Sequence, residues 1–163
     1  MVRCDFNVPL SEQGDILDDF KIRQTIPTII YLIENKARIV LMTHLGDPEG
    51  QIVEKLRLNR VADKLSDLLG LPVAKADDCV GFSAENQAEQ LPEGGILLLE
   101  NLRFHPGEEK GEESFSQSLA RLGEVYLNDA FAVCHRDHAS LRVARLLPSG
   151  AGILLEKEVK ILS

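Results

Sequence analysis

Two arginines follow apolar segments of this sequence. Arg103 comes shortly after the apolar run 96–99, and Arg136 comes after the run 125–128. Ligands of an open parallel sheet bind beyond the carboxyl ends of its strands, so two such strands would bring both guanidinium groups to one crevice. A planar guanidinium holds phosphate or carboxylate oxygens through paired hydrogen bonds. The spacing therefore predicts an anion-binding site.

Other basic or imidazole side chains also stand at expected strand ends. Taken singly, each arginine is better explained as a surface ion-pair partner, because the sequence is rich in acidic residues. Their matched placement favours an anion pocket instead. The further residues that we assign to this patch are Arg3, His44, His135 and His138.

Asp5 and Asn7 flank Phe6 near the start of the chain. Alternation along a strand would put both side chains on the same side. They either cap the turn before Pro9, as such residues often do, or accept hydrogen bonds from substrate hydroxyl groups.

Two other polar groups have simpler explanations than catalysis. The run from Cys134 through His135 to His138 could suggest a metal, but zinc sites normally supply three or four closely spaced ligands and the sequence shows no second cluster. We therefore predict no metal site and interpret both histidines as donors to an anion. Glu108 and Glu109 are interpreted as the solvated start of a helix, not as an acid–base pair.

The composition predicts a single soluble globular domain. The chain has 163 residues, of which 44% are hydrophobic and 27% charged. Its net charge of -8 argues against nucleic-acid binding, which needs an extended basic surface. No apolar stretch reaches the roughly 20 residues needed to cross a membrane. The sequence lacks a secretory signal, and its 3 widely spaced cysteines indicate reduced thiols, so we expect a cytoplasmic protein.

Short apolar segments alternate with helical patterns along the chain. Strands are expected at 2–6, 37–42, 71–75, 96–99, 125–128 and 150–154. Helices are expected after caps at Asp18 or Asp19, at 56–69 with Gly70 as its end, at 83–90 with Ser83 as its cap, and at 112–122, 140–146 and 155–162. This order predicts an α/β fold, with a doubly wound, Rossmann-like parallel sheet of about six strands in three αβα layers.

Neither common phosphate loop of nucleotide-binding proteins is present. The sequence contains no Gly-x-Gly-x-x-Gly after its first strand and no Gly-x-x-x-x-Gly-Lys-Ser/Thr. We therefore expect no nucleotide site of either kind in this chain.

Six segments resemble phosphoglycerate kinase, and they occur in the order and at the spacing of that family. The segments are 3–10 (RCDFNVPL), 43–46 (THLG), 78–81 (DCVG), 100–105 (ENLRFH), 128–131 (NDAF) and 135–140 (HRDHAS). The resemblance covers only the N-terminal lobe of the family. It implies that residues 1–163 are the substrate-binding lobe of a longer protein, whose C-terminal lobe would bind Mg-ATP or Mg-ADP.

The resemblance also implies a reaction and a set of site residues. The lobe would bind 3-phosphoglycerate or 1,3-bisphosphoglycerate, and the complete, monomeric enzyme would transfer a phosphoryl group reversibly between 1,3-bisphosphoglycerate and ADP. No cofactor is expected on this chain itself. The residues that match the family's substrate-binding positions are Asp5, Phe6, Asn7, Lys21, His44, Leu45, Gly46, Asp47, Arg103 and Arg136, with Arg3, His135 and His138 in a secondary basic patch.

Two of these positions depart from the family pattern, which has arginine at both. Lys21 stands where the family's arginine stabilises the moving phosphoryl group, and a lysine offers a point charge in place of a planar fork. Losing one such transition-state donor can cost roughly 10² to 10³ in rate. Arg23 is two residues away, about 200° around a helix, so we do not expect it to substitute.

Asp47 is the sharper departure, because it replaces a positive charge with a negative one. A carboxylate about 6 Å from a phosphate costs on the order of 3 kcal/mol at an effective dielectric near 20, before screening by salt. Lys21 and Asp47 together leave open an alternative, a catalytically impaired relative that binds anions or a partner. A third interpretation, a doubly wound ligand-binding domain unrelated to kinases, would require the order of the six segments to be accidental.

Overall fold

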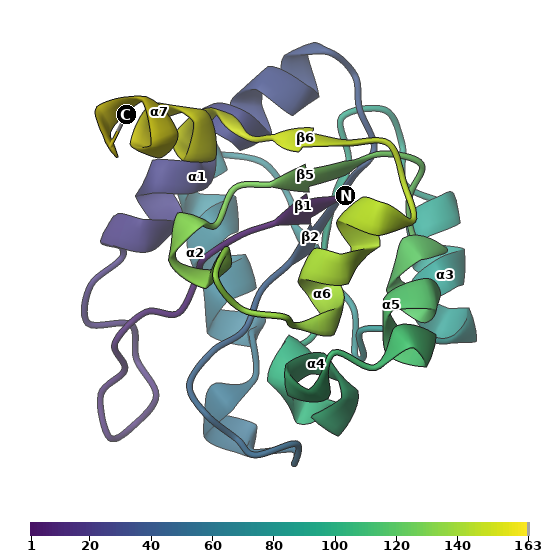
Figure 1. The fold of residues 1–163 in the computed structure, drawn as a ribbon. Helices are drawn as coiled ribbons and strands as arrows, with labels where there is room; N and C mark the ends of the chain where they lie inside the picture. Colours follow the sequence, from purple (N-terminus) through teal and green to yellow (C-terminus); the bar gives the residue numbers. More distant parts are fainter. Residues whose placement is uncertain (163) are drawn as a thin grey trace.

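The computed structural model describes residues 1–162 and contains a parallel sheet (Figure 1). Its strands are β1 (Val2–Arg3), β2 (Ile39–Met42), β3 (Ala74–Lys75), β4 (Ile96–Leu98), β5 (Tyr126–Asn128) and β6 (Ser149–Ala151). Within the described residues the sheet has six strands in the order β3-β4-β2-β1-β5-β6, and every neighbouring pair is parallel. The predicted α/β class and sheet are confirmed.

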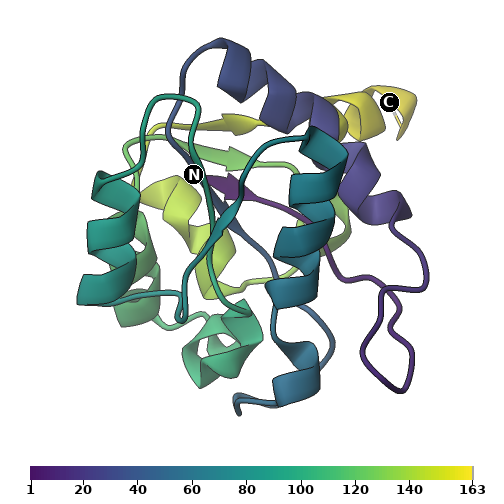
Figure 2. The same ribbon diagram turned by 180° about the vertical axis from the view of Figure 1, so that it is seen from behind.

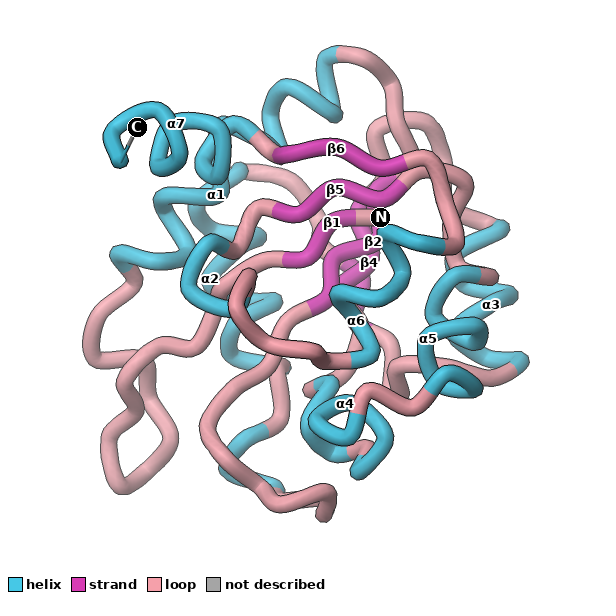
Figure 3. The backbone as a smooth tube through the Cα atoms, viewed as in Figure 1, coloured by secondary structure: helices cyan, strands magenta, loops and turns pink. Residues whose placement is uncertain are grey.

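Helices cover both faces of the sheet (Figure 3). The helices are α1 (Phe20–Glu34), α2 (Asn59–Leu69), α3 (Phe82–Glu89), α4 (Pro106–Lys110), α5 (Glu113–Ala120), α6 (Ala139–Arg142) and α7 (Ile153–Leu162). Short 3-10 turns are η1 (Glu54–Leu56), η2 (Leu102–Phe104), η3 (Phe131–Val133) and η4 (Val143–Arg145). The view from behind shows α1 and α2 in front of the strands (Figure 2).

Two apolar clusters form the core, one on each face of the sheet. The first joins α1 and α2 to the sheet through buried residues such as Ile22, Leu65 and Leu41. The second joins α3, α5 and α6 to the other face, with Leu97 and Leu119 among its members. This is the three-layer αβα arrangement predicted from the alternating pattern.

Several element boundaries differ from the sequence prediction. Gly81, not Ser83, precedes α3, and the Ser83 hydroxyl instead accepts a hydrogen bond from Gln87 inside the helix at 3.2 Å. The predicted helix 112–122 is shorter and follows a separate α4, because Gly111 adopts a left-handed φ of 62° between them. At the start of α1, Asp18 accepts a hydrogen bond from the backbone of Phe20.

The sheet places the carboxyl ends of all strands on one edge. In Figure 1, β1 runs from the N-terminus toward the left, and the other strands run the same way. The strands β4 and β5, which precede Arg103 and Arg136, are separated by β2 and β1. The two arginines therefore approach this edge from different sides. Within residues 1–162, no helix has the length and apolar character needed to cross a membrane.

Candidate anion site

The loops that follow β2 and β4 are tied together at the carboxyl edge. The side-chain oxygen of buried Asn101 accepts a hydrogen bond from Leu45 N at 3.2 Å, and its amide group donates to Leu45 O at 2.8 Å. Leu45 is itself buried, so its backbone and not its side chain shapes the site. Gly46 then turns with a φ of 63°, a conformation that a residue with a Cβ adopts at a cost.

The segment after β1 is fixed to the same loop. Asn7 accepts a hydrogen bond from Gly46 N at 2.9 Å, and Asp5 accepts one from Asn7 N at 3.1 Å. Phe6 N donates to the Thr43 hydroxyl at 2.9 Å, and the Phe6 ring is fully buried. Phe6 therefore contributes packing beneath the site and offers no exposed side chain to a ligand.

Arg103 lies over the Gly46 turn. Its guanidinium donates to Gly46 O at 2.9 Å, and only 13% of its side chain is exposed. Two carboxylates approach the same group, with Glu109 Oε1 at 3.3 Å from Nε and Asp47 Oδ1 at 3.8 Å from Nη1. The Asp47 side chain is 70% exposed. An incoming anion would thus compete with two acidic side chains for Arg103.

Lys21 reaches the site from α1. Its ammonium group lies 2.9 Å from Asp5 Oδ2, and its side chain is 44% exposed. Arg23 points to a different partner, since its Nε donates to Asp19 at 2.8 Å. This pairing agrees with the expectation that Arg23 does not replace Lys21.

Arg3 lies below this surface and is fully buried. Its Nε donates to the Ser140 hydroxyl at 3.0 Å, a terminal nitrogen donates to the Nδ1 of His44 at 3.1 Å, and the other donates to the carbonyl of Cys4. All three nitrogens therefore have partners within the protein. Arg3 acts on the site through its charge and through His44.

His44 is buried among cations and is neutral. Burial, followed by the charges of Arg3, Arg103, His138 and Lys21, lowers the pKa of His44 to about 2. Since arginine only donates hydrogen bonds, the Nδ1 facing Arg3 must be the acceptor, which leaves the ring proton on Nε2. His44 can thus donate a hydrogen bond to a ligand, but it adds no positive charge.

Glu108 corrects the sequence interpretation, because it is fully buried and not solvated. Its two carboxylate oxygens accept hydrogen bonds from Ser140, one from the backbone N at 2.9 Å and one from the hydroxyl at 2.5 Å. The same hydroxyl accepts from Arg3, so Ser140 links the buried cation to the buried anion. The short α4 packs against α6, which carries Ser140, and this packing carries Glu108 inward.

His138 lies beside Glu108, with its Nδ1 at 3.8 Å from Glu108 Oε1. Burial lowers the pKa of His138, the Glu108 charge opposes this shift, and the guanidinium groups of Arg103 and Arg3 add to it. Its buried Nδ1 has no hydrogen-bond partner among the described residues. His138 is therefore part of the layer below the site.

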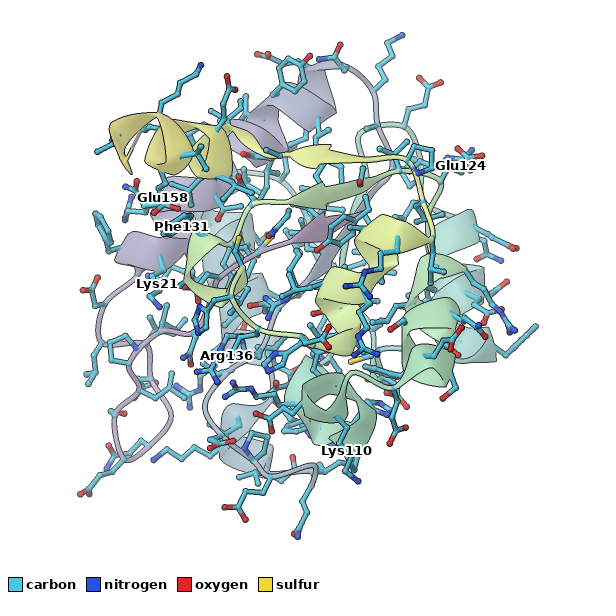
Figure 4. All side chains as sticks on the ribbon, in the orientation of Figure 1. Lys21, Lys110, Glu124, Phe131, Arg136 and Glu158 are labelled. Carbon is cyan, nitrogen blue, oxygen red and sulfur yellow. The ribbon has the colours of Figure 1, made fainter. Side chains whose placement is uncertain are left out.

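Arg136 and His135 are exposed on the loop between η3 and α6. No hydrogen bond or ion pair joins either side chain to another group within residues 1–162. Figure 4 shows Arg136 and Lys21 on the side of the molecule toward which the strands run. Arg136 is thus a guanidinium without a partner among the described residues, on the same side of the molecule as Lys21.

The structure brings together most of the predicted residues but divides them by depth. Lys21, Arg103, His138 and Arg3 all act on the ring of His44. Glu108 and Ser140 were missed as members of this group. A hollow of about 580 Å³, lined by Met1 and Val125 among others, lies at the opposite edge of the sheet and is separate from the candidate site.

No metal cluster forms at Cys134, His135 and His138 among the described residues. The group of potential ligands that the structure does bring together is Asp78, Cys79 and His105. It lies where the loops after β3 and β4 meet, and none of its three residues is assigned to the anion site.

Comparison with known proteins gives one consistent family. The family model described as "Phosphoglycerate kinase" matches residues 1–163. The chain is 51% identical to the phosphoglycerate kinase of Pelotomaculum thermopropionicum over 163 residues, and 53% identical to that of Moorella thermoacetica over 163 residues. Each alignment covers 99% of this chain and 41% of the relative.

The fold matches as well as the sequence. The crystal structure of phosphoglycerate kinase from Pyrococcus horikoshii superimposes with a TM-score of 0.90 at 35% identity, over 99% of this chain and 41% of that one. The chain thus spans about two fifths of the length of the relatives that it matches.

Proposed function

The chain belongs to the phosphoglycerate kinase family, and we propose that residues 1–163 are the N-terminal, phosphoglycerate-binding lobe of such an enzyme. The complete protein would catalyse the glycolytic transfer of a phosphoryl group between 1,3-bisphosphoglycerate and ADP, giving 3-phosphoglycerate and ATP. The observation that carries this proposal is the gathering of Lys21, Arg103 and Arg3 around His44 in a chain of net charge -8. A local concentration of cations in an acidic molecule favours a small anion as the ligand.

Each group has a role that its geometry supports. Arg103 and Arg136 would hold the phosphate and carboxylate groups, and His44 would donate a neutral hydrogen bond from Nε2. Asp5 and Asn7, already joined by a hydrogen bond, would orient the substrate hydroxyl.

Phosphoryl transfer depends mainly on positioning and positive charge. Lys21, whose side chain is 44% exposed, would supply that charge to the moving group. The nucleotide, with Mg²⁺, would bind a C-terminal lobe outside this chain. The isolated chain would then bind phosphoglycerate but transfer nothing.

A second candidate function rests on the carboxylates around Arg103. Asp47 and Glu109 lie within 4 Å of its guanidinium, and Lys21 is already paired with Asp5. A lobe whose lysine and arginine side chains are already paired with its own carboxylates would bind phosphoglycerate weakly. Such a domain would serve as an anion-binding or partner-binding module without normal kinase activity.

Calorimetric titration with 3-phosphoglycerate, together with turnover of the full-length protein, tests the main proposal. We expect the chain to bind 3-phosphoglycerate, and we expect the full-length protein to convert it in the presence of Mg-ATP. If a full-length protein with a folded nucleotide lobe showed no turnover, the kinase proposal would be rejected. The second candidate function, an anion-binding or partner-binding module, would then remain. Turnover by residues 1–163 alone would contradict the assigned division between the lobes.

Replacing Lys21→Arg together with Asp47→Arg separates the two functions. We expect affinity for 3-phosphoglycerate to rise at least tenfold if these positions control the site. Two planar guanidinium groups would replace the Lys21 ammonium and the Asp47 carboxylate. The control is Lys36→Arg with Glu93→Arg, an exposed pair 3.9 Å apart at the opposite edge of the sheet. It makes the same change in total charge, so an equal rise there would assign the effect to net charge alone.

The remaining assignments follow from the same proposal. We place the protein in the cytoplasm as a monomer, without nucleic-acid or membrane partners. Its cysteines Cys4, Cys79 and Cys134 are unpaired, which supports a reducing compartment. Sedimentation of the full-length protein and imaging of a tagged copy in its own cells would test the oligomeric state and the compartment.

A further inference from the structure

Three potential metal ligands meet where two loops at the carboxyl edge come together. Asp78 and Cys79 follow β3, and His105 follows η2, which comes after the neighbouring strand β4. One ligand atom from each residue lies within 4.8 Å of the other two. The three residues are a carboxylate, a thiol and an imidazole, which are the ligand types that zinc combines in proteins.

The local geometry holds these residues in place while leaving one side open. His105 Nε2 lies 2.5 Å from Asp78 Oδ1, and the same oxygen accepts a hydrogen bond from Cys79 N at 2.6 Å. The His105 ring stacks on Phe115 with centroids 4.8 Å apart, which fixes its orientation. The Asp78 side chain is 55% exposed and that of His105 is 30% exposed, so an ion has a path from solvent.

Cys79 supplies the inner ligand. Its side chain is fully buried, and its thiol donates a hydrogen bond to the carbonyl of Glu100 at 2.9 Å. This hydrogen bond holds the sulfur toward the meeting point of the loops, beneath the two exposed ligands.

We propose that Asp78, Cys79 and His105 form a binding site for Zn²⁺, with water as the fourth ligand. Zinc bonds of roughly 2.0–2.3 Å place tetrahedral ligand atoms about 3.3–3.6 Å apart. The widest separation would have to shrink by about 1 Å from the 4.8 Å limit, and the 2.5 Å contact between Asp78 and His105 would have to lengthen. Rotation of the exposed Asp78 side chain, together with a shift of the His105 ring within its stacking plane, supplies both changes. Binding exchanges the Cys79 thiol proton for the metal and releases that proton to solvent, while His105 binds as a neutral imidazole.

Asp78 brings a negative charge to this position, and a carboxylate stabilises a divalent cation beside it. A bound ion would also link the loop after β3 to the loop that carries Arg103. The proposal does not depend on phosphoglycerate binding.

Cobalt titration of the metal-free protein tests the site by spectroscopy. Co²⁺ accepts the same tetrahedral ligands as Zn²⁺, and a cysteine thiolate bound to it gives a charge-transfer band in the near ultraviolet. We expect one equivalent of Co²⁺ to produce this band together with the visible bands of a four-coordinate ion, and we expect Zn²⁺ to remove them by displacement.

The variants assign the band to individual residues. Cys79→Ser should abolish the charge-transfer band, and His105→Gln should weaken Co²⁺ binding at least tenfold. Cys134→Ser is the matched control, because Cys134 is the exposed cysteine on another loop, and it should leave the spectrum unchanged. His105 is partly exposed, so its variant decides the question if Cys79→Ser fails to fold. No thiolate band at one equivalent, a band that survives Cys79→Ser, or unchanged affinity in His105→Gln would overturn the proposal.

Discussion

The charged groups at the carboxyl edge of the sheet form two layers that differ in burial and pairing. The buried layer contains Arg3 and Glu108, both fully buried and joined through the Ser140 hydroxyl. The rim contains Asp47 and Arg136, both exposed. Removing one partner from a buried network leaves an uncompensated charge, whereas exposed ion pairs contribute little to stability. The buried layer should therefore control folding, and the rim should control ligand affinity.

Glu108→Ala gives the largest expected effect and tests the buried layer. The change leaves Arg3 without its nearby negative charge and Ser140 without two acceptors. We expect the free energy of unfolding to fall by about 3–5 kcal/mol. Urea denaturation followed by circular dichroism measures it.

The adjacent carboxylate supplies the control. Glu109 is exposed on the same short helix and pairs with Arg103 at 3.3 Å. Glu109→Ala should change the free energy of unfolding by less than about 1 kcal/mol. Similar losses for the two variants would remove the distinction between the layers.

His44 predicts how the buried layer responds to pH. Its pKa is about 2 in the folded protein and about 6.5 when unfolded, so between these values the unfolded chain binds more protons. The contribution of His44 to the free energy of unfolding is fully present above the unfolded pKa of about 6.5. It falls as the pH decreases from that value toward the folded pKa of about 2. At pH 5 the loss relative to pH 8 should be about 2 kcal/mol.

Comparing the wild type with His44→Gln isolates that contribution. Other titrating groups, including His138 with its lowered pKa, affect both proteins. Urea unfolding at pH 8 and pH 5 should therefore show a smaller loss in the variant by about 2 kcal/mol. An identical loss in both proteins would mean that His44 accepts a proton within the folded structure.

Arg136 tests the rim, since its guanidinium has no partner among residues 1–162. We expect Arg136→Gln to weaken 3-phosphoglycerate binding about tenfold, the equivalent of roughly 1.4 kcal/mol. Its free energy of unfolding should change by less than about 0.5 kcal/mol.

Arg23→Gln removes an equal charge from an arginine that is already paired with Asp19. Calorimetric titration should show little change in affinity for this variant. If Arg23→Gln weakens binding as much as Arg136→Gln, then the loss reflects overall charge and not a contact with the ligand.

The sheet was predictable because its signal is local. The buried runs that became β2 and β4 are continuous apolar segments, as expected for parallel strands covered on both faces. Gly70 ends α2 with a left-handed φ of 64°, and this position was also predicted. In each case neighbouring residues carry the information.

The depth of the charged groups was not predictable, because it depends on contacts between distant residues. Arg3 and Ser140 are 137 positions apart, and nothing near either one marks their hydrogen bond. Glu108 lies on a helix of 5 residues, too short for its periodicity to separate a buried face from an exposed one. His44 was assigned to the anion pocket from its place after a strand, but its neutrality follows from burial and from the charge of Arg3, which the sequence does not show.

Asp47 gives the smallest expected effect and the finest test of the rim. Its carboxylate lies 3.8 Å from Arg103 but is 70% exposed, so solvent weakens the pairing. Asp47→Asn should strengthen 3-phosphoglycerate binding about fivefold at low salt, which is roughly 1 kcal/mol. Because both charges are near solvent, this gain should shrink as the salt concentration rises to about 0.5 M.

Asp67→Asn is the control for this prediction, because Asp67 is exposed on α2 and its loss makes the same change in charge. Calorimetric titrations at two salt concentrations compare the variants. A gain for Asp47→Asn that does not depend on salt would mean that the amide makes a direct contact with the ligand. An equal gain for Asp67→Asn would mean that repulsion by the whole acidic molecule, and not competition at Arg103, limits binding. Either outcome would contradict the assignment of ligand affinity to local charges at the rim.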